Sequence, residues 1–403
     1  MKYDFTKVPN REGMDAMAVD LPEFLREMAK DSLQPRIPMW VADMNFATSP
    51  AITEAIIRRT EHPLFGYYSP RAEYYDAIIG WQERRHGWRG VTPEQIGYEN
   101  GVLGGVVSAL RILCSQGDSV LVHSPTYVGF THVLEDNGYH MVHSPLRKDA
   151  EGLYRMDFED MEIKFRDQHI HTLLFCSPHN PTGRVWERAE LEQLTALCEK
   201  YDVYIICDEI WSDLILPGFT HLPLQTVNET ARERTISFYA PSKTFNLAGL
   251  IGSYHIISNP RLRHRMEKES SLCHYNSMNV LSQYALIGAY RPESEEWLDQ
   301  LLQVLDTNLR YGADFIRDRF SGVELTRPQG TYLLFPDCEG WLKDHGKTLD
   351  ELLRAGYRAG VIWQDGRQFR GNTHIRMNLA CPTAWVQEAF DRLDRLVFNA
   401  DKW

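Results

Sequence analysis

The hydrophobic pattern of the chain changes twice along its length. From Gly97 to Ile257, short apolar runs rich in β-branched residues alternate with segments of helical periodicity. Apolar runs of this kind, separated by amphipathic helices, are typical of parallel strands that are covered on both faces. We therefore predict a mostly parallel sheet flanked by helices. Strands are expected at residues 119–122, 139–143, 172–176, 203–207, 235–239 and 252–257, and helices at 101–114, 127–136 and 187–201.

Different patterns precede and follow this central region. The first 45 residues are irregular, whereas long helical periodicity dominates beyond Asn259. Proline after a Thr-Ser cap at Pro50, and a glycine stop at Gly87, mark further helix ends. The remaining elements are expected as helices at 51–59, 74–86, 297–320 and 383–397 and as strands at 331–335 and 374–379.

These patterns predict a large α/β domain accompanied by a smaller α+β domain. A chain of 403 residues exceeds what one compact core usually holds. We expect residues 1–48 to form an arm that is part of the small domain, residues 49–288 to form the large domain, and residues 289–403 to complete the small domain.

Composition excludes several classes of protein. The 55 acidic and 43 basic residues give a net charge of -12, which disfavours binding to nucleic acid. The seven cysteines are scattered and never spaced as CxxC, so we expect free thiols of a reducing compartment and no metal site. Residues 1–10 are too polar for a signal peptide, and no apolar run approaches the roughly 18 residues of a membrane span. A cytoplasmic location is therefore expected.

One lysine is a candidate nucleophile. Lys243 follows the apolar run 235–239 and has apolar and turn-forming neighbours. Burial lowers the pKa of a lysine, and the neutral amine can then form a Schiff base with a carbonyl group. Most lysines are solvated surface charges, however, and the lysine alone does not decide between these two interpretations.

Four other motifs follow predicted strands, where open α/β sheets bind ligands. The backbone N–H groups of Val102 and Leu103, at a glycine-rich helix start, could bind a phosphate, although the glycines could equally serve close packing. Asn180 lies in an Asn-Pro-Thr-Gly turn that could be an ordinary loop. Asp208 could face a cationic ligand or a salt-bridge partner. Tyr127 could stack on a flat cofactor or belong to the core.

The order of these features resembles the fold-type I pyridoxal-phosphate enzymes of the class I/II aminotransferase superfamily. Within that superfamily the chain is most similar to the cystathionine β-lyase and cystalysin-like carbon–sulfur lyases. The resemblance covers nearly the whole chain and implies the PLP-dependent transferase fold. The phrases that carry it are Met39-Trp40-Val41-Ala42-Asp43-Met44, Phe65-Gly66-Tyr67, Leu174-Phe175-Cys176-Ser177-Pro178-His179-Asn180-Pro181, Ala240-Pro241-Ser242-Lys243-Thr244-Phe245-Asn246 and Arg376-Met377-Asn378-Leu379-Ala380.

The resemblance implies pyridoxal 5'-phosphate as cofactor and Lys243 and Tyr127 as catalytic residues. Lys243 would hold the cofactor and then remove the Cα proton of the substrate, while Tyr127 would stack on the ring. Asp208 would keep the pyridine nitrogen protonated. Asn180 would bind the ring oxygen O3'.

The resemblance also implies residues that bind the phosphate and the substrate. Ser242, with the backbone near Val102 and Leu103, would hold the phosphate. Tyr67 would reach the same phosphate from a neighbouring subunit, which requires a homodimer with shared active sites. Arg376 would bind the α-carboxylate of an amino-acid substrate.

Trp211 departs from the pattern of the relatives. Transaminases typically carry tyrosine at this position and the lyases carry histidine. The indole N–H of Trp211 could still donate to O3', but it cannot accept or relay a proton. Substrate handling could therefore differ from that of the relatives.

The expected function is PLP-dependent β-elimination. A sulfur-containing L-amino acid would be cleaved to pyruvate, ammonia and a thiol. The alternative is an aminotransferase, which would use the same residues. A third possibility is a regulatory or binding protein that keeps the fold and the cofactor.

Overall fold

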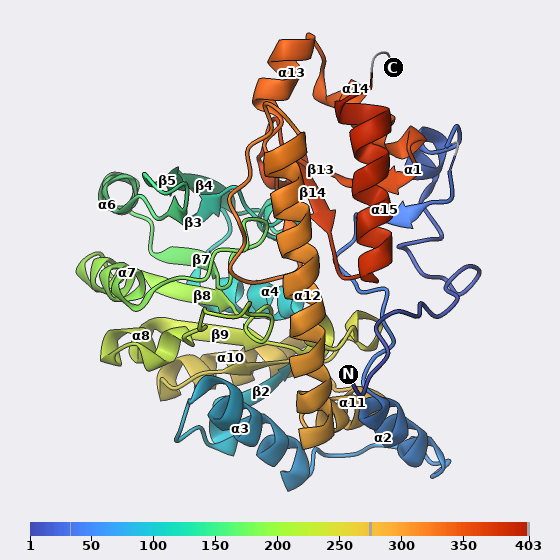
Figure 1. The fold of residues 1–403 in the computed structure, drawn as a ribbon. Coiled ribbons are helices and arrows are strands. Elements are labelled where there is room, and N and C mark those ends of the chain that lie inside the picture. Colours follow the sequence, from blue (N-terminus) through green and yellow to red (C-terminus); the bar gives the residue numbers. More distant parts are fainter. Residues whose placement is uncertain (33, 274–275, 401–403) are drawn as a thin grey trace. The chain divides into compact units, whose positions relative to one another are not determined.

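The computed structural model describes residues 1–32, 34–273 and 276–400 (Figure 1). They form two compact units, one of Thr48–Asn180 and Arg184–Asp299, and one of Met1–Ala47, Pro181–Gly183 and Gln300–Trp403. The boundary between the large unit and the C-terminal part of the other unit lies between Asp299 and Gln300, inside helix α12 (Pro292–Arg319). The sequence predicted this boundary earlier, at residue 288. The helix continues across the boundary without a break, so no loop marks it in the sequence.

A seven-stranded sheet forms the centre of the first unit (Figure 1). Its strand order is β2-β10-β9-β8-β7-β3-β4, and β10 runs opposite to the other six strands. The predicted fold class, a mostly parallel sheet flanked by helices, is confirmed. The strands are β2 (Ile96–Glu99), β3 (Ser119–Ser124), β4 (His140–Pro145), β7 (Thr172–Cys176), β8 (Tyr204–Asp208), β9 (Thr235–Tyr239) and β10 (Ser253–Ile256).

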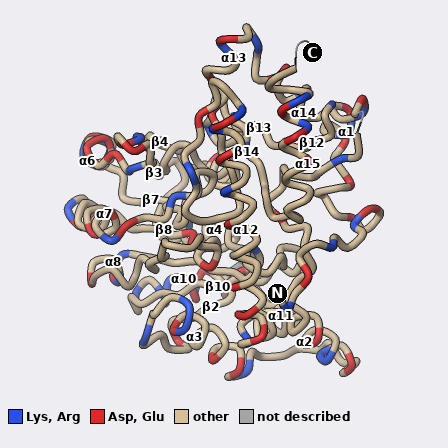
Figure 2. The backbone as a smooth tube through the Cα atoms, in the orientation of Figure 1, with Lys and Arg blue, Asp and Glu red and all other residues tan. Residues whose placement is uncertain are grey.

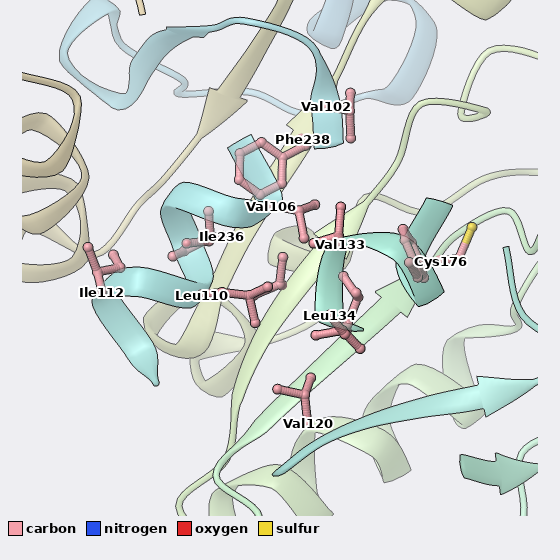
Figure 3. Packing of buried hydrophobic residues seen from close by; sticks show 14 of the residues in the cluster. Val102, Val106, Leu110, Ile112, Val120, Val133, Leu134, Cys176, Ile236 and Phe238 are labelled. Carbon is pink, nitrogen blue, oxygen red and sulfur yellow. The ribbon is translucent and has the colours of Figure 1, made fainter. Parts of the chain in front are cut away.

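Helices cover both faces of this sheet because successive strand residues point to opposite sides. Ile206 packs with Leu110 and Phe238 in one hydrophobic cluster, part of which Figure 3 shows. The adjacent residues Ile205 and Cys207 belong to a second cluster on the other face. The first cluster includes residues of α4 (Val102–Leu113), α5 (Val128–Asp136) and α10 (Pro260–Cys273), and the second includes residues of α6 (Phe158–Asp167), α7 (Arg188–Lys200) and α8 (Glu229–Arg234).

Charged residues gather on the outer helices of this unit. Figure 2 shows Lys, Arg, Asp and Glu along α6 and α7, whereas strand β7 carries none. Strand β8 has one carboxylate, Asp208, at its last position. A charge at the end of an otherwise apolar strand is thus set apart from the solvated surface. The other helices of this unit are α2 (Pro50–Thr60), α3 (Ala72–His86), α9 (Pro241–Thr244) and α11 (Val280–Ala289).

The second unit combines short strands with helices. Strand β14 pairs antiparallel with β11 and β13, and β1 of the N-terminal arm runs parallel to β12. The strand expected at 331–335 is only Leu333–Leu334, because Thr331 adopts a left-handed φ of 68°. The elements are α1 (Glu23–Met28), β1 (Ile37–Pro38), β11 (Leu333–Leu334), α13 (Glu339–His345), α14 (Leu349–Arg358), β12 (Val361–Ile362), β13 (Gln364–Asp365), β14 (Ile375–Asn378) and α15 (Thr383–Leu393).

Among the described residues, no helix has both the length and the apolar character that crossing a membrane requires.

Candidate active site

Three parallel strands place candidate residues at one edge of the sheet. In the register of the sheet, Cys176 lies opposite Asp208, and Asp208 lies opposite Phe238. Strands β7, β8 and β9 therefore end together, and their following segments carry Asn180, Asp208 and Lys243. The Ser177 N–H donates to the Asp208 carbonyl oxygen at 3.0 Å and so ties the Asn180 loop to the end of β8.

Lys243 lies in the four-residue helix α9, close to the turn that follows β8. Its ammonium nitrogen is 5.8 Å from the centroid of the Trp211 ring, and Trp211 is buried. A cation over the face of an indole is attracted by the ring quadrupole, so Trp211 stabilises a charged Lys243. The residue expected to depart from the family pattern thus lies beside the lysine itself.

Asp208 is a buried carboxylate. Burial raises its pKa to about 7, which the hydrogen bond from the Ile210 N–H and the positive charge of Lys243 oppose. The Ile210 N–H donates to its Oδ1 at 3.0 Å. The positive charge of Lys243 offsets the effect of burial only in part, because the pKa of Asp208 stays well above its ordinary value of 3.8. A cationic ligand group beside Asp208 would therefore offset the cost of its burial.

The start of helix α4 has the geometry of an anion site. Gly101 precedes the helix with a φ of 80°, which favours glycine, and the first N–H groups of α4, at Val102 and Leu103, have no acceptor inside the helix. Gly105 has a different role, because a Cβ there would lie 2.4 Å from Cε1 of Phe238. The glycine-rich run thus serves close packing at Gly105, and phosphate binding at its start stays a prediction.

Asn180 and Tyr127 border the same edge. Asn180 is buried, 3% exposed, in the loop after β7. Tyr127 caps helix α5 after β3, and its ring lies edge-on to Phe130 with centroids 5.6 Å apart. The half-buried Tyr127 ring also covers Gly129, where a Cβ would approach it to 2.5 Å. Part of this tyrosine is core, and the rest remains accessible.

Tyr67 lies on the surface of the same unit. Its side chain is fully exposed, and it lines a surface pocket of about 750 Å³ together with Tyr98 and Asn276. Ser242, half-buried, immediately precedes Lys243. The roles of both residues in phosphate binding stay predictions.

Arg376 belongs to the second unit, in strand β14. It is buried, its guanidinium carbon lies 4.3 Å from the centroid of the Phe369 ring, and Nη2 donates to the Trp40 carbonyl oxygen at 3.0 Å. A second hydrogen bond from Nη2 goes to Gln364. The guanidinium is therefore held in a fixed orientation, as two-pronged carboxylate binding requires.

Comparison with known proteins identifies the family. The sequence model of the aminotransferase class I and II family matches residues 37–393. The chain belongs to this family. It is 35% identical to cystathionine beta-lyase PatB of Bacillus subtilis (strain 168), over 89% of this chain and 91% of PatB.

Two solved structures of the family are similar over almost their whole length. Cystalysin from Treponema denticola, which contains a pyridoxal 5'-phosphate cofactor, has a TM-score of 0.90 and 30% identity, with 98% of each chain covered. The PLP-bound C-S lyase from Staphylococcus hominis has a TM-score of 0.88 and 30% identity, with 100% of each chain covered. The family predicted from the sequence is thus confirmed, and these relatives bear the names of the predicted enzyme class.

The aminotransferase-family site has the donors that pyridoxal 5'-phosphate needs. Lys243 can form the covalent link, Asp208 can face the ring nitrogen, and the N-terminus of α4 can hold the phosphate. The burial of Asp208, whose effect on the pKa Lys243 offsets only in part, is the observation that fits a positively charged ring best. Which residue touches which cofactor atom stays a prediction.

Several polar residues around this site have no counterpart in the sequence-based prediction. Asn276 accepts the Asn100 N–H at 2.7 Å and so braces the segment before α4. Asp213 and Glu209, in the turn after β8, each lie beside a histidine ring. Two of these residues are within five positions of Asp208. The histidine beside Asp213 lies 127 positions away in the sequence, and the histidine beside Glu209 lies 12 positions away. Only the position after a site strand could have drawn attention to them.

Proposed function

We propose that this protein is a pyridoxal-phosphate-dependent carbon–sulfur β-lyase. Its substrate would be a sulfur-containing L-amino acid such as L-cystathionine, and its products a thiol, pyruvate and ammonia. The observation that carries the proposal is a buried Asp208 that senses the charge of Lys243 at the carboxyl edge of the sheet, in a chain similar to cystathionine β-lyase and C–S lyases.

The bound cofactor would supply an electron sink for the carbanion formed at the substrate Cα. Lys243 would hold the cofactor and would then take the Cα proton of the bound substrate. Asp208 keeps a proton on the ring nitrogen, because a buried carboxylate favours an adjacent positive charge. The indole ring of Trp211 stabilises the lysine after it has accepted the proton.

The substrate is bound and oriented by other residues. Arg376 binds the α-carboxylate with a guanidinium that Trp40, Gln364 and Phe369 hold in place. Asn180 would donate to the ring oxygen O3', and Tyr127 would cover one face of the ring. These contacts would align the Cα–H bond and the β-substituent for elimination.

The functional form would be a homodimer. Tyr67 is fully exposed in the chain by itself, and the neighbouring Phe65 and Leu64 are more than half exposed. In a dimer, the Tyr67 hydroxyl of one subunit would reach the phosphate bound by the other. The described cysteines carry free thiols, which supports a reducing compartment, the cytoplasm.

An aminotransferase is the second candidate, because the family model that matches the chain is that of aminotransferases. The two activities differ in their need for a keto-acid acceptor. We expect the holoenzyme to release pyruvate and a thiol steadily from L-cystathionine without any acceptor. Turnover that depends on an added keto acid, with no pyruvate released in its absence, would refute the lyase proposal and support transamination.

A further inference from the structure

Asp213 is a buried carboxylate to which the reaction assigns no role. It lies in the turn after β8, two residues beyond Trp211, and its side chain is 5% exposed. Trp81 Nε1 donates to its Oδ1 at 3.0 Å, and His86 Nε2 lies 2.9 Å from the same oxygen. The other oxygen, Oδ2, accepts the hydroxyl hydrogen of Thr244 at 2.8 Å.

These contacts keep the Asp213 carboxylate charged. Burial acts to raise the pKa of Asp213. The hydrogen bond and charge of His86 and the hydrogen bond from Thr244 together outweigh this effect, so the pKa lies below its ordinary value. Hydrogen bonds to an ionised acceptor are stronger than those between neutral groups. The hydroxyl of Thr244 is thus held by a strong acceptor.

Thr244 is the residue after Lys243 and ends helix α9. A helix of only four residues, Pro241–Thr244, is not stable by itself and depends on contacts with its surroundings. The Thr244–Asp213 hydrogen bond is such a contact, and it connects α9 to the turn that carries Asp208 and Trp211. It spans 31 positions of sequence and joins the segments that follow two neighbouring strands.

The turn itself is anchored at its other end by a second buried carboxylate. Glu209 Oε2 lies 2.8 Å from His221 Nε2, and the Glu209 N–H donates to the carbonyl of Phe238 at 2.9 Å. The rings of His86 and His221 meet edge to face with centroids 5.5 Å apart. The turn is therefore fixed on both sides, and the hydroxyl of Thr244 joins α9 to a rigid support.

We infer that Asp213, acting through Thr244, is a positioning residue that fixes the place of Lys243 relative to Asp208 and Trp211. The inference rests on the proposed function, because it assumes that Lys243 carries the cofactor. A lysine held in place before the cofactor binds does not have to be ordered on binding, which increases affinity. The expected consequence of losing the contact is weaker and less uniform binding of pyridoxal phosphate.

The test compares Thr244→Val, which replaces the hydroxyl with a methyl group, with Thr244→Ser, which retains it. Thr195→Val is the matched control, because Thr195 is fully buried in α7 of the same unit and its hydroxyl donates to the Leu191 carbonyl at 3.0 Å. For each holoenzyme, the dissociation constant of pyridoxal phosphate, the visible circular dichroism of the bound cofactor and the unfolding midpoint are measured.

We expect T244V to bind pyridoxal phosphate about tenfold more weakly than the unchanged protein, with an altered visible dichroism. T244S should behave as the unchanged protein, and T195V should unfold at lower temperature with unchanged cofactor affinity. Unchanged affinity and dichroism in T244V would overturn the inference, whatever its unfolding midpoint.

Should T244V not fold, Asp213→Asn decides in the same way. Its amide keeps the volume and can still accept from Trp81, while a neutral NH2 group replaces the charged oxygen that accepts from Thr244. Weakened cofactor binding therefore supports the inference, and unchanged binding overturns it. Neither outcome depends on the reaction, since no substrate is present. A failure of the lyase proposal would instead show itself as absent pyruvate in the unchanged holoenzyme.

Discussion

Replacing Asp208 with asparagine should stabilise the cofactor-free protein while it weakens the holoenzyme. The side chain is 3% exposed, and burial is the main reason that its pKa lies at about 7. Asparagine has nearly the same shape and can keep the acceptor for the Ile210 N–H, but it has no charge to desolvate. The cost of burying a carboxylate is thus removed, together with the partner of the cofactor ring.

The size of the effect follows from linkage between proton binding and folding. A buried carboxyl group whose pKa is raised on folding makes the protein less stable as the pH rises. For Asp208 the stability falls between pH 3.8, its pKa in the unfolded chain, and pH of about 7, its pKa in the folded protein. Each pH unit between these values corresponds to about 1.4 kcal/mol. The loss in the unchanged protein is therefore about 2 kcal/mol near pH 5.5 and reaches about 4 kcal/mol above pH 8.

Urea unfolding of the cofactor-free proteins near pH 5.5 and near pH 8.5 measures this difference. D208N should be more stable than the unchanged protein at both values, with a gain that roughly doubles at the higher pH. Asp136→Asn, at an exposed position of α5, is the control and should change stability by less than about 1 kcal/mol. A gain that is absent, or that does not grow with pH, would refute the explanation of the Asp208 environment.

Three further outcomes are expected. Gly105→Ala should destabilise the protein by about 1–3 kcal/mol in urea unfolding, because the added methyl group would lie 2.4 Å from the ring of Phe238; unchanged stability would contradict this packing. Tyr67→Phe should weaken pyridoxal-phosphate binding about tenfold by equilibrium dialysis, whereas Tyr68→Phe, whose hydroxyl donates to a backbone carbonyl at 2.7 Å, should not. Arg376→Lys should raise the KM for L-cystathionine about tenfold with little change in kcat, since lysine keeps the charge and loses the planar fork; an unaltered KM would argue against its role in carboxylate binding.

The sheet could be predicted closely because its strands are apolar on both faces. The expected strands at 172–176 and 235–239 agree with β7 and β9 residue for residue. The ends of helices were harder to predict from the sequence. The long helix α12 begins at Pro292, where proline in the first turn was a usable signal, rather than at the expected residue 297. Helix α14 was not predicted, although Thr348 and Glu351 form the capping box that precedes an amphipathic pattern.

The candidate site was predictable where a residue follows a strand and less so where tertiary contacts decide its role. Lys243, Asp208 and Asn180 could be found because parallel strands end at one edge. The contact between Lys243 and the ring of Trp211 could not, since it depends on how two turns pack. The same holds for Asp213, whose donors come from segments distant in sequence.

The most direct test of the account is the identity of the lysine that carries the cofactor. The holoenzyme is reduced with borohydride, which fixes the lysine–cofactor bond, and the modified peptide is identified by mass spectrometry. The account predicts a single phosphopyridoxyl group on Lys243, in the peptide that follows strand β9. A label on another lysine, or a protein that retains no pyridoxal phosphate at all, would contradict it.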